Sequence, residues 1–583
     1  MPADDLRALA ERWIANDPDS ATRDELRALL ARPEISVADR ASLEDRFAGP
    51  LAFGTAGLRG VIGAGPNRMN RAVVARATWA LARVLLEAVP DAVERGVVVG
   101  ADARRMSREF AEDAAAILAS AGLRVVLFRS PVPTPLVGFT VKRLAAAAGV
   151  VVTASHNPPE YNGYKVYWQN AAQIVPPVDA AIAAAIERAP PAVQIEWPTL
   201  DTLRASGWVT DAPADIESAY VSAIRDLAVH PHEGDRTLGI VYTPLHGVGD
   251  ALVRRTLAEA GFTDVRSVPQ QQAPDGAFPT VAFPNPEEPG AMDLAFAFAK
   301  EHDAKLVLAN DPDADRLAVA LPNAGGRGFH ALTGNQVGVL LGHYLLTERA
   351  PSKRPRAVLA SIVSTPLLGR IAADLGVHYE ETLTGFKWIA NRAIELEAEG
   401  YDFVFGFEEA LGYCVGGAVR DKDGISGALL VAELAAVLRA RGLSLEGQLD
   451  VIAGRWGVWS SAQVNVTRAG ARGASELREI MDRLRAAPPR RLGDDTVVSV
   501  VDYETGLARP GLPKSNVVAL RLASGARVIA RPSGTEPKAK LYFDVREFVA
   551  PGEAPALASA RAERSLEQLK GAMNEALGLE RLR

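Results

Sequence analysis

Apolar runs of strand length alternate with stretches of helical periodicity along most of the chain. The runs GVVVGAD (96–102), LRVVLF (123–128) and AAGVVVTAS (147–155) predict strands, and the pattern at about 108–121 predicts a helix between the first two. Uninterrupted Val, Leu and Ile residues are typical of strands that are buried on both faces, as in mostly parallel sheets. We therefore expect an α/β domain in this region.

The same alternation of strands and helices begins again twice. A second round contains the strand TLGIVYTP, a predicted helix at about 250–260 and the strand KLVLAND at 305–311. A third round contains the strands AVLASIV at 357–363 and FVFGFEE at 403–409. The chain up to about residue 455 is thus predicted to form three similar α/β units.

The last part of the chain has a different pattern. After about Trp456 the strands alternate apolar and polar residues, as in VVALRLA and KLYFDV, and a charged helix follows. The predicted fold class is α/β, with three similar mixed domains of largely parallel sheets and a smaller α+β C-terminal domain. Four domains also suit a length of 583 residues, and we place them at 1–205, 206–325, 326–455 and 456–583.

The charge balance and the cysteine content exclude several classes of protein. The chain has 64 Lys and Arg against 71 Asp and Glu, a net charge of −7, which is the wrong sign for a broadly basic surface that holds nucleic acid or anionic lipid. Cys414 is the only cysteine, which excludes an intrachain disulfide, a cysteine-based zinc site and an iron–sulfur cluster. We expect a cytoplasmic protein without nucleic-acid or membrane partners, because the N-terminus lacks a signal-peptide pattern and no uncharged apolar run approaches ~18 residues.

The sequence Thr153-Ala-Ser-His-Asn-Pro158 directly follows a predicted strand. This order places the hydroxyl of Ser155 at the carboxyl end of a strand, where open α/β sheets bind their ligands. A serine held in such a turn can accept a phosphoryl group, or it can simply hydrogen-bond within the turn. His156 taken alone is more often a structural hydrogen-bonding residue.

Three carboxylates follow the apolar strand that ends at residue 310. Pro312 disfavours the helical region for Asp311, so the segment should begin extended, and Asp311, Asp313 and Asp315 then project to one side. Three like charges so close together require a cation, and ligands with oxygen donors alone favour Mg²⁺, with Ca²⁺ and Mn²⁺ as alternatives. An EF-hand is excluded because Arg316 stands where that loop needs Gly. The alternative is a solvated acidic turn.

The segment Arg531-Pro-Ser-Gly-Thr-Glu-Pro-Lys538 combines a guanidinium, two hydroxyls and a glycine between predicted strands. Arg supplies a bidentate donor, and Gly534 lets backbone N–H groups approach an anion closely. These features predict a phosphate-binding loop, although the same residue types also build ordinary turns. It is not a Walker A loop, because no GxxxxGK[ST] pattern occurs.

Other polar positions are weaker candidates when each is taken alone. Glu408 and Glu409 end a predicted strand and could accept hydrogen bonds from a polyol, but adjacent glutamates are common on surfaces. Lys387 and Arg59 lie in loops flanked by Gly, where a positively charged side chain alone does not indicate one particular role. The stretch HGVGD at 246–250 links a strand to a helix, but Leu252 replaces the third Gly of a dinucleotide fingerprint, which argues against NAD binding.

Five of these motifs occur in a characteristic order. FGTAGLRG, TASHNP, DPDADR, GFEEALGY and RPSGTEPK, spread over residues 53–538, together resemble the α-D-phosphohexomutase superfamily of phosphoglucomutases and phosphomannomutases. The resemblance implies four domains around a central cleft. The wording of GTAGLRG, GFEEALGY and TGFKW is similar to the longer branch, which includes phosphopentomutase-like and bisphosphate-forming enzymes.

The resemblance also implies residue roles. Ser155 would carry the phosphoryl group, and one Mg²⁺ per active site would be held by a phosphoserine oxygen with Asp311, Asp313 and Asp315. Arg316 would position the phosphoserine, and Glu408 would contact sugar hydroxyls. The catalytic set would be Ser155, His156, Lys165, Arg59 and Lys422, with Lys165 and Lys422 assisting proton transfer. The substrate-binding set would be Glu408, Glu409, Lys387, Arg531, Ser533, Gly534, Thr535 and Lys538.

The expected activity is that of a phosphosugar mutase, which moves a phosphoryl group between the 1-position and the terminal hydroxyl of a sugar. A sugar 1,6-bisphosphate would be its intermediate and activator, a small phosphosugar its partner, and a monomer or homodimer its state. A phosphopentomutase or a sugar-bisphosphate synthase is the alternative within the superfamily. Ala410 favours broad or pentose specificity, because many glucose- and mannose-selective members carry Ser there.

Two more distant alternatives stay open. An aspartyl-phosphate phosphatase would use Asp311 or Asp313 as its nucleophile, since an acidic pair after a buried strand also suits that chemistry. A non-catalytic phosphosugar-binding protein would keep only the phosphate-binding loop.

Overall fold

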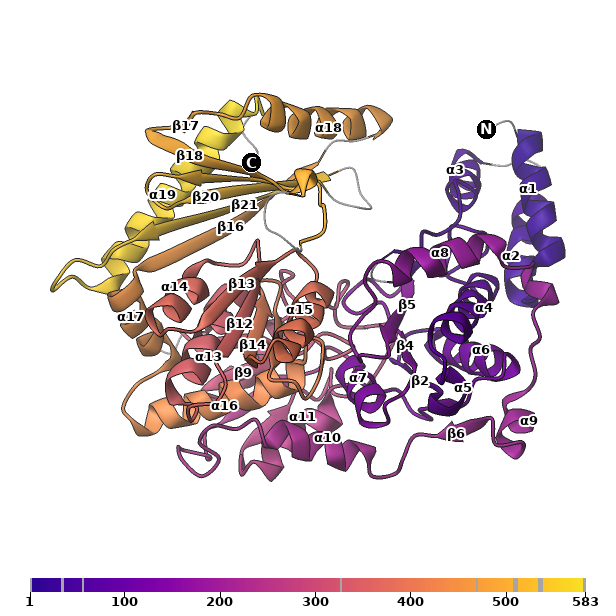
Figure 1. The fold of residues 1–583 in the computed structure, drawn as a ribbon, viewed down its shortest axis with the longest axis horizontal. Coiled ribbons are helices and arrows are strands. Elements are labelled where there is room, and N and C mark those ends of the chain that lie inside the picture. The colour runs from indigo at the N-terminus through magenta and orange to yellow at the C-terminus, as the bar shows by residue number, and fades with distance from the viewer. Residues whose placement is uncertain are drawn as a thin grey trace. The chain divides into compact units, whose positions relative to one another are not determined.

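The fold consists of sheets flanked by helices, seen in a computed structural model (Figure 1). The structure describes residues 3–32, 36–54, 57–323, 325, 328–467, 470–506, 512–532 and 538–579. These residues form two compact units, Met1–Leu332 with Leu411–Ala436, and Thr333–Ala410 with Val437–Arg583. Among the described residues, no helix is both long enough and apolar enough to cross a membrane.

The first unit opens with three helices and a six-stranded mixed sheet. The helices are α1 (Ala3–Asn16), α2 (Ser20–Leu30) and α3 (Val37–Arg46). The strand order is β1 (Leu58–Val61), β5 (Tyr161–Trp168), β4 (Ala148–Val152), β2 (Val97–Ala101), β3 (Val125–Leu127) and β6 (Val209–Asp211). Strands β4, β2, β3 and β6 are parallel, whereas β5 runs antiparallel to both of its neighbours.

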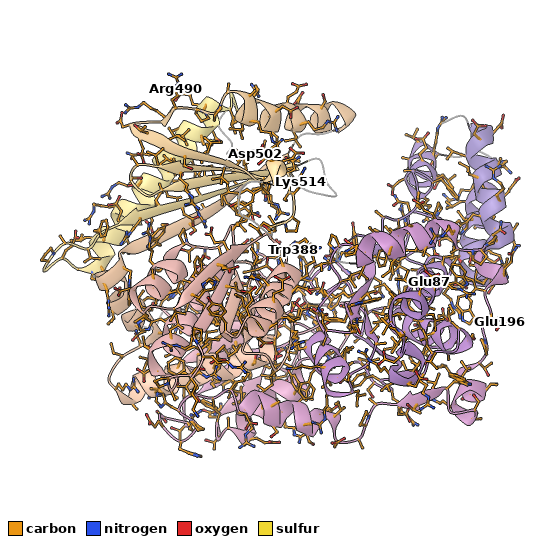
Figure 2. All side chains as sticks on the ribbon, in the orientation of Figure 1. Glu87, Glu196, Trp388, Arg490, Asp502 and Lys514 are labelled. Carbon is orange, nitrogen blue, oxygen red and sulfur yellow. The ribbon has the colours of Figure 1, made fainter. Side chains whose placement is uncertain are left out.

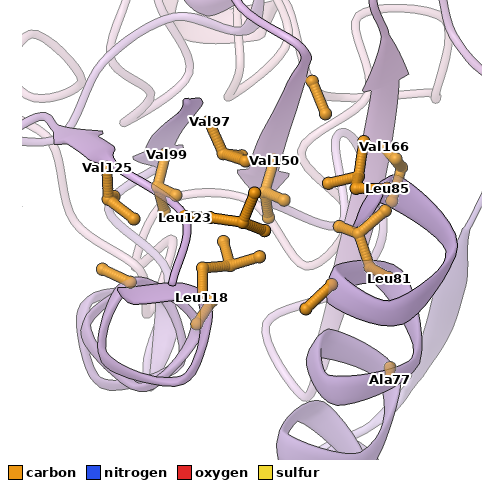
Figure 3. Close-up of a cluster of buried hydrophobic side chains, with 14 of the residues drawn as sticks. Ala77, Leu81, Leu85, Val97, Val99, Leu118, Leu123, Val125, Val150 and Val166 are labelled. Carbon is orange, nitrogen blue, oxygen red and sulfur yellow. The ribbon is translucent and has the colours of Figure 1, made fainter. Parts of the chain in front are cut away.

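Helices cover both faces of this sheet. Helix α7 (Thr134–Arg143) lies on one face, and α4 (Arg71–Ala88) and α6 (Ser107–Ser120) lie on the other (Figure 1). The remaining helices are α5 (Ala92–Arg95), α8 (Val178–Arg188), α9 (Leu200–Ala205) and the 3-10 turn η1 (Ala192–Gln194). Figure 3 shows Leu81 and Leu85 of α4 packing with Leu118 of α6 and with Val99 and Val150 of the strands, and all five are fully buried.

A second sheet follows in the same unit, in the order β11 (Phe329–Ala331), β10 (Ala318–Pro322), β9 (Leu306–Ala309), β7 (Ile240–Thr243) and β8 (Val265–Ser267). Strands β9, β7 and β8 are parallel, and β10 and β11 extend the sheet in antiparallel pairs. Its helices are α10 (Ile216–Arg225), α11 (Asp250–Glu259) and α12 (Asp293–Glu301). Strand β15 (Gly412–Val415) and most of α16 (Gly424–Ala440) also belong to this unit.

The second unit contains a parallel arrangement of β13 (His378–Thr382), β12 (Arg356–Ser361) and β14 (Asp402–Glu408). Its helices are α13 (Gly334–Glu348), α14 (Leu367–Asp374), α15 (Phe386–Ala398) and α17 (Leu445–Trp456). Alternate residues of β14 face opposite helices: Phe407 lies against Gly338 of α13, and Gly406 lies against Ile389 of α15.

The C-terminal part of this unit is an antiparallel sheet, in the order β16 (Val458–Thr467), β21 (Lys538–Glu547), β20 (Arg527–Pro532), β19 (Val518–Leu522), β18 (Asp495–Asp502) and β17 (Arg491–Leu492). Helices α18 (Gly470–Ala486) and α19 (Pro555–Ala576) share a core with it, and η2 (Tyr503–Thr505) follows β18. Its other face packs on Ile362, Val363 and Leu383 through Ile529 and Tyr542.

The predicted fold class is confirmed, because three α/β sheets with parallel strands precede a C-terminal antiparallel sheet with helices. The helix expected at about 108–121 is α6, and the one expected at about 250–260 is α11. The division at residues 205, 325 and 455 and the central cleft stay predictions.

The core of the first sheet supports a stability prediction. Leu81→Ala should lower the free energy of unfolding by about 2–5 kcal/mol, because the fully buried leucine leaves a cavity among α4, α6 and the strands. Thermal unfolding of matched samples measures the difference. The control Leu144→Ala, at a leucine that is 36% exposed, should shift the unfolding midpoint far less. Equal shifts would show that this cluster does not carry the domain's stability.

Candidate active site

Two loops at the carboxyl ends of parallel strands bring a serine to a carboxylate. The loop after β4 carries Ser155, and the loop after β9 carries Asp311. The hydroxyl of Ser155 donates a hydrogen bond to Asp311 Oδ2 at 2.6 Å, and both side chains are buried. Ser155 has a φ of 52°, a left-handed conformation that few non-glycine residues adopt. Strands β4 and β9 belong to different sheets, so the strand pattern predicts that each residue lies at a strand end but does not predict that the two loops meet.

The three predicted metal ligands form one cluster. One carboxylate oxygen from each of Asp311, Asp313 and Asp315 lies within 4.8 Å of the others, and all three residues are buried. In the part of the chain that the structure describes, Asp313 Oδ1 and Asp315 Oδ1 are buried without a hydrogen-bond partner. A buried carboxylate oxygen without a donor is costly, and a hard cation would satisfy both atoms. The solvated acidic turn is therefore ruled out by burial, and the cluster can hold a metal ion.

Burial and mutual repulsion govern the charges in this cluster. Burial, and then the carboxylates of Asp313 and Asp315, raise the pKa of Asp311 well above its ordinary value. Burial also opposes the ionisation of Asp315, but the ammonium groups of Lys165 and Lys422 hold its pKa below the ordinary value. Because metal ligands must be deprotonated, a bound cation would favour the ionised form of all three carboxylates.

The two predicted proton-transfer lysines share Asp315. Lys165, on β5, places Nζ 2.7 Å from Asp313 Oδ2 and 3.0 Å from Asp315 Oδ2. Lys422, just before α16, places Nζ 3.3 Å from Asp315 Oδ2 and 3.5 Å from Asp421 Oδ1. Both lysines thus lie beside the carboxylate cluster.

The other predicted basic residues surround the serine. His156 Nδ1 lies 3.3 Å from Ser155 Oγ, and Arg59 Nη1 donates to Asn157 Oδ1 at 3.2 Å. Burial, and then the guanidinium groups of Arg316 and Arg59, lower the pKa of His156 well below its ordinary value, so the ring is neutral at pH 7. The backbone N–H of Arg316 donates to Asp311 Oδ1 at 3.0 Å. The structure therefore brings together the whole predicted catalytic set.

The predicted sugar-binding residues belong to the second unit. Glu408 ends β14, and its Oε1 accepts a hydrogen bond from Gly385 N at 2.7 Å. Lys387 lies in the first turn of α15, with Nζ 4.7 Å from the ring centroid of Trp388, which is labelled in Figure 2. The carboxylate of Glu409 accepts hydrogen bonds from two serine hydroxyls, those of Ser361 and Ser364, at 3.1 Å each.

The predicted phosphate-binding loop is described only at its edges. Arg531 lies half-buried on β20. Ser533, Gly534 and Thr535 lie outside the described residues, as does the side chain of Lys538. The phosphate-binding role of this loop stays a prediction.

The HGVGD stretch supports the carboxylate loop. Val248 N donates to Pro312 O at 2.9 Å, and a Cβ on Gly247 would come within 2.4 Å of Pro312 Cα. Gly247 therefore allows two backbones to touch. This contact is invisible to sequence reasoning, which considered the stretch only as a dinucleotide motif. Sequence reasoning also missed Thr134, whose hydroxyl donates to Asp313 Oδ2 at 2.7 Å.

The geometry suits chemistry on a negatively charged group attached to Ser155. The hydroxyl of Ser155 lies next to the carboxylate cluster that can hold a cation. Lys165 and Lys422 lie beside the same cluster, and the neutral ring of His156 lies beside the hydroxyl. Phosphoryl transfer needs this combination of charge neutralisation and positioning, with little other covalent assistance from the protein.

Comparisons with known proteins point in the same direction. Residues 50–192, 218–326 and 333–452 match the three domains described as phosphoglucomutase/phosphomannomutase, alpha/beta/alpha domains I, II and III. A phosphopentomutase of Pongo abelii is 37% identical, over 92% of this chain and 90% of its own. A probable phosphomannomutase of Haemophilus influenzae is 41% identical, over 82% of this chain and 93% of its own. The crystal structure of a putative phosphomannomutase from Thermus thermophilus has a TM-score of 0.65 and 26% identity, and the match covers 89% of this chain and 99% of that one.

The carboxylate cluster generates a prediction about metal binding. Mg²⁺ at about 100 times its dissociation constant should stabilise the protein by ~2.7 kcal/mol, seen as a rise in the thermal unfolding midpoint. Asp313→Asn should abolish the rise, because it removes charge from the cluster without removing volume. Asp303→Asn, at an aspartate before β9 whose side chain is 90% exposed, should keep it. An undiminished rise in Asp313→Asn would place the ion elsewhere.

Proposed function

Because this chain belongs to the phosphoglucomutase/phosphomannomutase family, we propose that it is a phosphosugar mutase that works through a phosphorylated Ser155. It moves a phosphoryl group between the 1-position and the terminal hydroxyl of a sugar. The observation that carries the proposal is the buried hydrogen bond of 2.6 Å between Ser155 Oγ and Asp311, at the edge of a cluster that can hold a metal ion.

The proposed transfer exchanges one bond to phosphorus for another. A sugar hydroxyl oxygen forms a bond to the phosphorus on Ser155 as the bond from phosphorus to Ser155 Oγ breaks. The leaving Oγ takes a proton from a lysine ammonium group, and the resulting amine accepts the sugar hydroxyl proton. This gives a sugar bisphosphate, which turns over and returns its other phosphoryl group to Ser155. Lys165 and Lys422 are the proton-handling residues of the proposal, because both ammonium groups lie beside Asp315 in the same cluster.

Mg²⁺ is the metal of the proposal. Asp311, Asp313 and Asp315 would hold it with an oxygen of the phosphoserine, which suits a cation that prefers oxygen ligands. The ion supplies charge neutralisation to the group in transfer. Arg316 adds positive charge beside the cluster. His156, whose ring is neutral, can donate or accept a hydrogen bond near Ser155 Oγ.

The substrate is gripped at two ends. In the proposal, Glu408 accepts hydrogen bonds from sugar hydroxyls, and Lys387 and Glu409 belong to the same substrate-binding set. Glu409 is oriented by hydrogen bonds from the hydroxyls of Ser361 and Ser364. The distal phosphate is bound by the loop with Arg531, Ser533, Gly534, Thr535 and Lys538.

The proposed sugar class is pentose phosphate, with hexose phosphates as slower substrates. Ala410 lacks the hydroxyl that follows the sugar-binding glutamate in many hexose-selective members, and a relative of the same length class is a phosphopentomutase. The protein is proposed to be cytoplasmic and to act as a monomer or homodimer. A panel of ribose, deoxyribose, glucose and mannose 1-phosphates, each with its bisphosphate, measures the preference. Bisphosphate release as the main product would identify the sugar-bisphosphate synthase alternative.

Loss of Ser155 should abolish turnover. Ser155→Ala is expected to lower the rate by several orders of magnitude, because no oxygen remains to carry the phosphoryl group. The control Ser120→Ala, at the end of helix α6 on the first sheet, should leave the rate unchanged. Mass mapping should find acid-stable phosphate on Ser155. An acyl phosphate that hydroxylamine cleaves, on Asp311 or Asp313, would establish the aspartyl-phosphatase alternative.

Arg531 should act on substrate binding. Arg531→Ala is expected mainly to raise KM with a smaller effect on kcat, because a grip on the distal phosphate is made equally in the ground and transition states. Steady-state kinetics measure both constants. Arg521→Ala, on β19 with a side chain that is 59% exposed, is the control and should change neither. A pure fall in kcat at unchanged KM contradicts this role.

A further inference from the structure

A buried guanidinium that the reaction scheme does not use lies behind Ser155. Arg104 follows β2, and its side chain is 0% exposed. Its Nη2 donates to the carbonyl oxygen of Ser155 at 2.6 Å and also to that of Asn157. Its Nη1 donates to the carbonyl oxygens of Pro158 at 2.8 Å and Tyr161 at 3.2 Å. One side chain thus holds three carbonyls of the loop between β4 and β5 and the carbonyl of the first residue of β5.

Asp102 connects the same guanidinium to the other side of Ser155. Its Oδ2 lies 3.3 Å from Arg104 Nε and accepts a hydrogen bond from the Thr153 hydroxyl at 2.6 Å. The Thr153 oxygen in turn accepts a hydrogen bond from Ser155 N at 2.8 Å. The N–H and the C=O of Ser155 are therefore both fixed by one buried ion pair. This explains how Ser155 keeps a left-handed φ of 52°, which costs a non-glycine residue on the order of 1–2 kcal/mol.

Packing leaves Arg104 little freedom to move. The Phe278 ring centroid lies 4.8 Å from Arg104 Cζ. A Cβ on Gly276 would lie 2.7 Å from Arg104 Cα and 2.6 Å from the Ala103 carbonyl, so the glycine lets this segment touch the loop after β2. Arg104 is thus enclosed between the loop that carries Ser155 and the segment that contains Gly276 and Phe278.

The donor count suits arginine and no other residue. A guanidinium has five N–H groups in a planar fork. Here the four on Nη1 and Nη2 donate to four carbonyls, and Nε lies 3.3 Å from Asp102 Oδ2 in an ion pair without hydrogen-bond geometry. A lysine ammonium has three donors at a single point and cannot span the same set. Replacing the arginine therefore removes donors from these carbonyls and releases the serine backbone. Of these carbonyls, that of Pro158 keeps Tyr161 N at 3.1 Å as a further donor.

We propose that Arg104, anchored by Asp102, is a positioning residue that fixes the backbone of Ser155 so that its oxygen faces the carboxylate cluster during phosphoryl transfer. Arg104 does not touch the reacting atoms and acts only through the loop. The inference rests on the proposed function, because it assigns the residue a part in loading and unloading Ser155.

The test compares two arginines that both hold backbone carbonyls. Arg95, at the opposite end of the first sheet, donates to the carbonyls of Ala145 at 2.7 Å and Ala146 at 3.2 Å. Arg104→Lys and Arg95→Lys in the full chain are treated with glucose 1,6-bisphosphate, and intact mass after rapid quenching gives the rate of Ser155 phosphorylation. We expect Arg104→Lys to slow loading and kcat on the order of 100-fold with little change in KM, and Arg95→Lys to keep both rates.

Wild-type loading and turnover in Arg104→Lys would overturn the proposal, and so would equal losses in both variants. If Arg104→Lys does not fold, Thr153→Val and Thr153→Ser decide, because only the serine keeps the hydroxyl between Asp102 and Ser155 N. Slow loading in the valine variant alone supports the proposal, and equal rates in both overturn it. If the wild-type protein itself does not become phosphorylated, the proposed function is refuted. This result differs from a loss of phosphorylation in the Arg104 or Thr153 variants alone.

Discussion

The burial of three carboxylates beside one hydroxyl is the constraint on which the rest of the structure depends. Removing a carboxylate from water costs several kcal/mol, and three within 4.8 Å of one another add their mutual repulsion. Lys165 and Lys422 neutralise part of this charge, yet two carboxylate oxygens still have no hydrogen-bond donor among the described residues. A bound cation would satisfy these two oxygens, and Ser155 Oγ lies 2.6 Å from Asp311 Oδ2 at the edge of the same cluster.

The α/β architecture supplies the positions that this cluster needs. Strands β4 and β9 end at loops that carry Ser155 and Asp311, and the antiparallel strand β5 returns alongside β4 to deliver Lys165. Close contacts between backbones then hold the loops in place, as where Gly247 meets Pro312. Rigid sheets thus set the approximate places of the reactive groups, and small residues and buried polar side chains refine them.

Sequence patterns predicted those parts of the site that follow from local structure. The apolar strands before Ser155 and Asp311 were sufficient to place both residues on loops at strand ends, and the spacing of the three aspartates indicated a metal site. Lys165 lies within a strand with no motif of its own, so only the family resemblance pointed to it. Arg104, Thr134 and the HGVGD stretch act through contacts between segments distant in sequence, which no local pattern reveals.

The central claim is that the phosphoryl group passes through Ser155, and the direct measurement is the fate of that group in a single turnover. Protein that carries radiolabelled phosphate on Ser155 is mixed with an excess of ribose 1-phosphate and Mg²⁺, then quenched at successive times. The account predicts that the label leaves the protein at least as fast as steady-state turnover and appears in ribose bisphosphate and then ribose 5-phosphate. Label that stays on Ser155 through many turnovers, or that leaves only as inorganic phosphate, would contradict it.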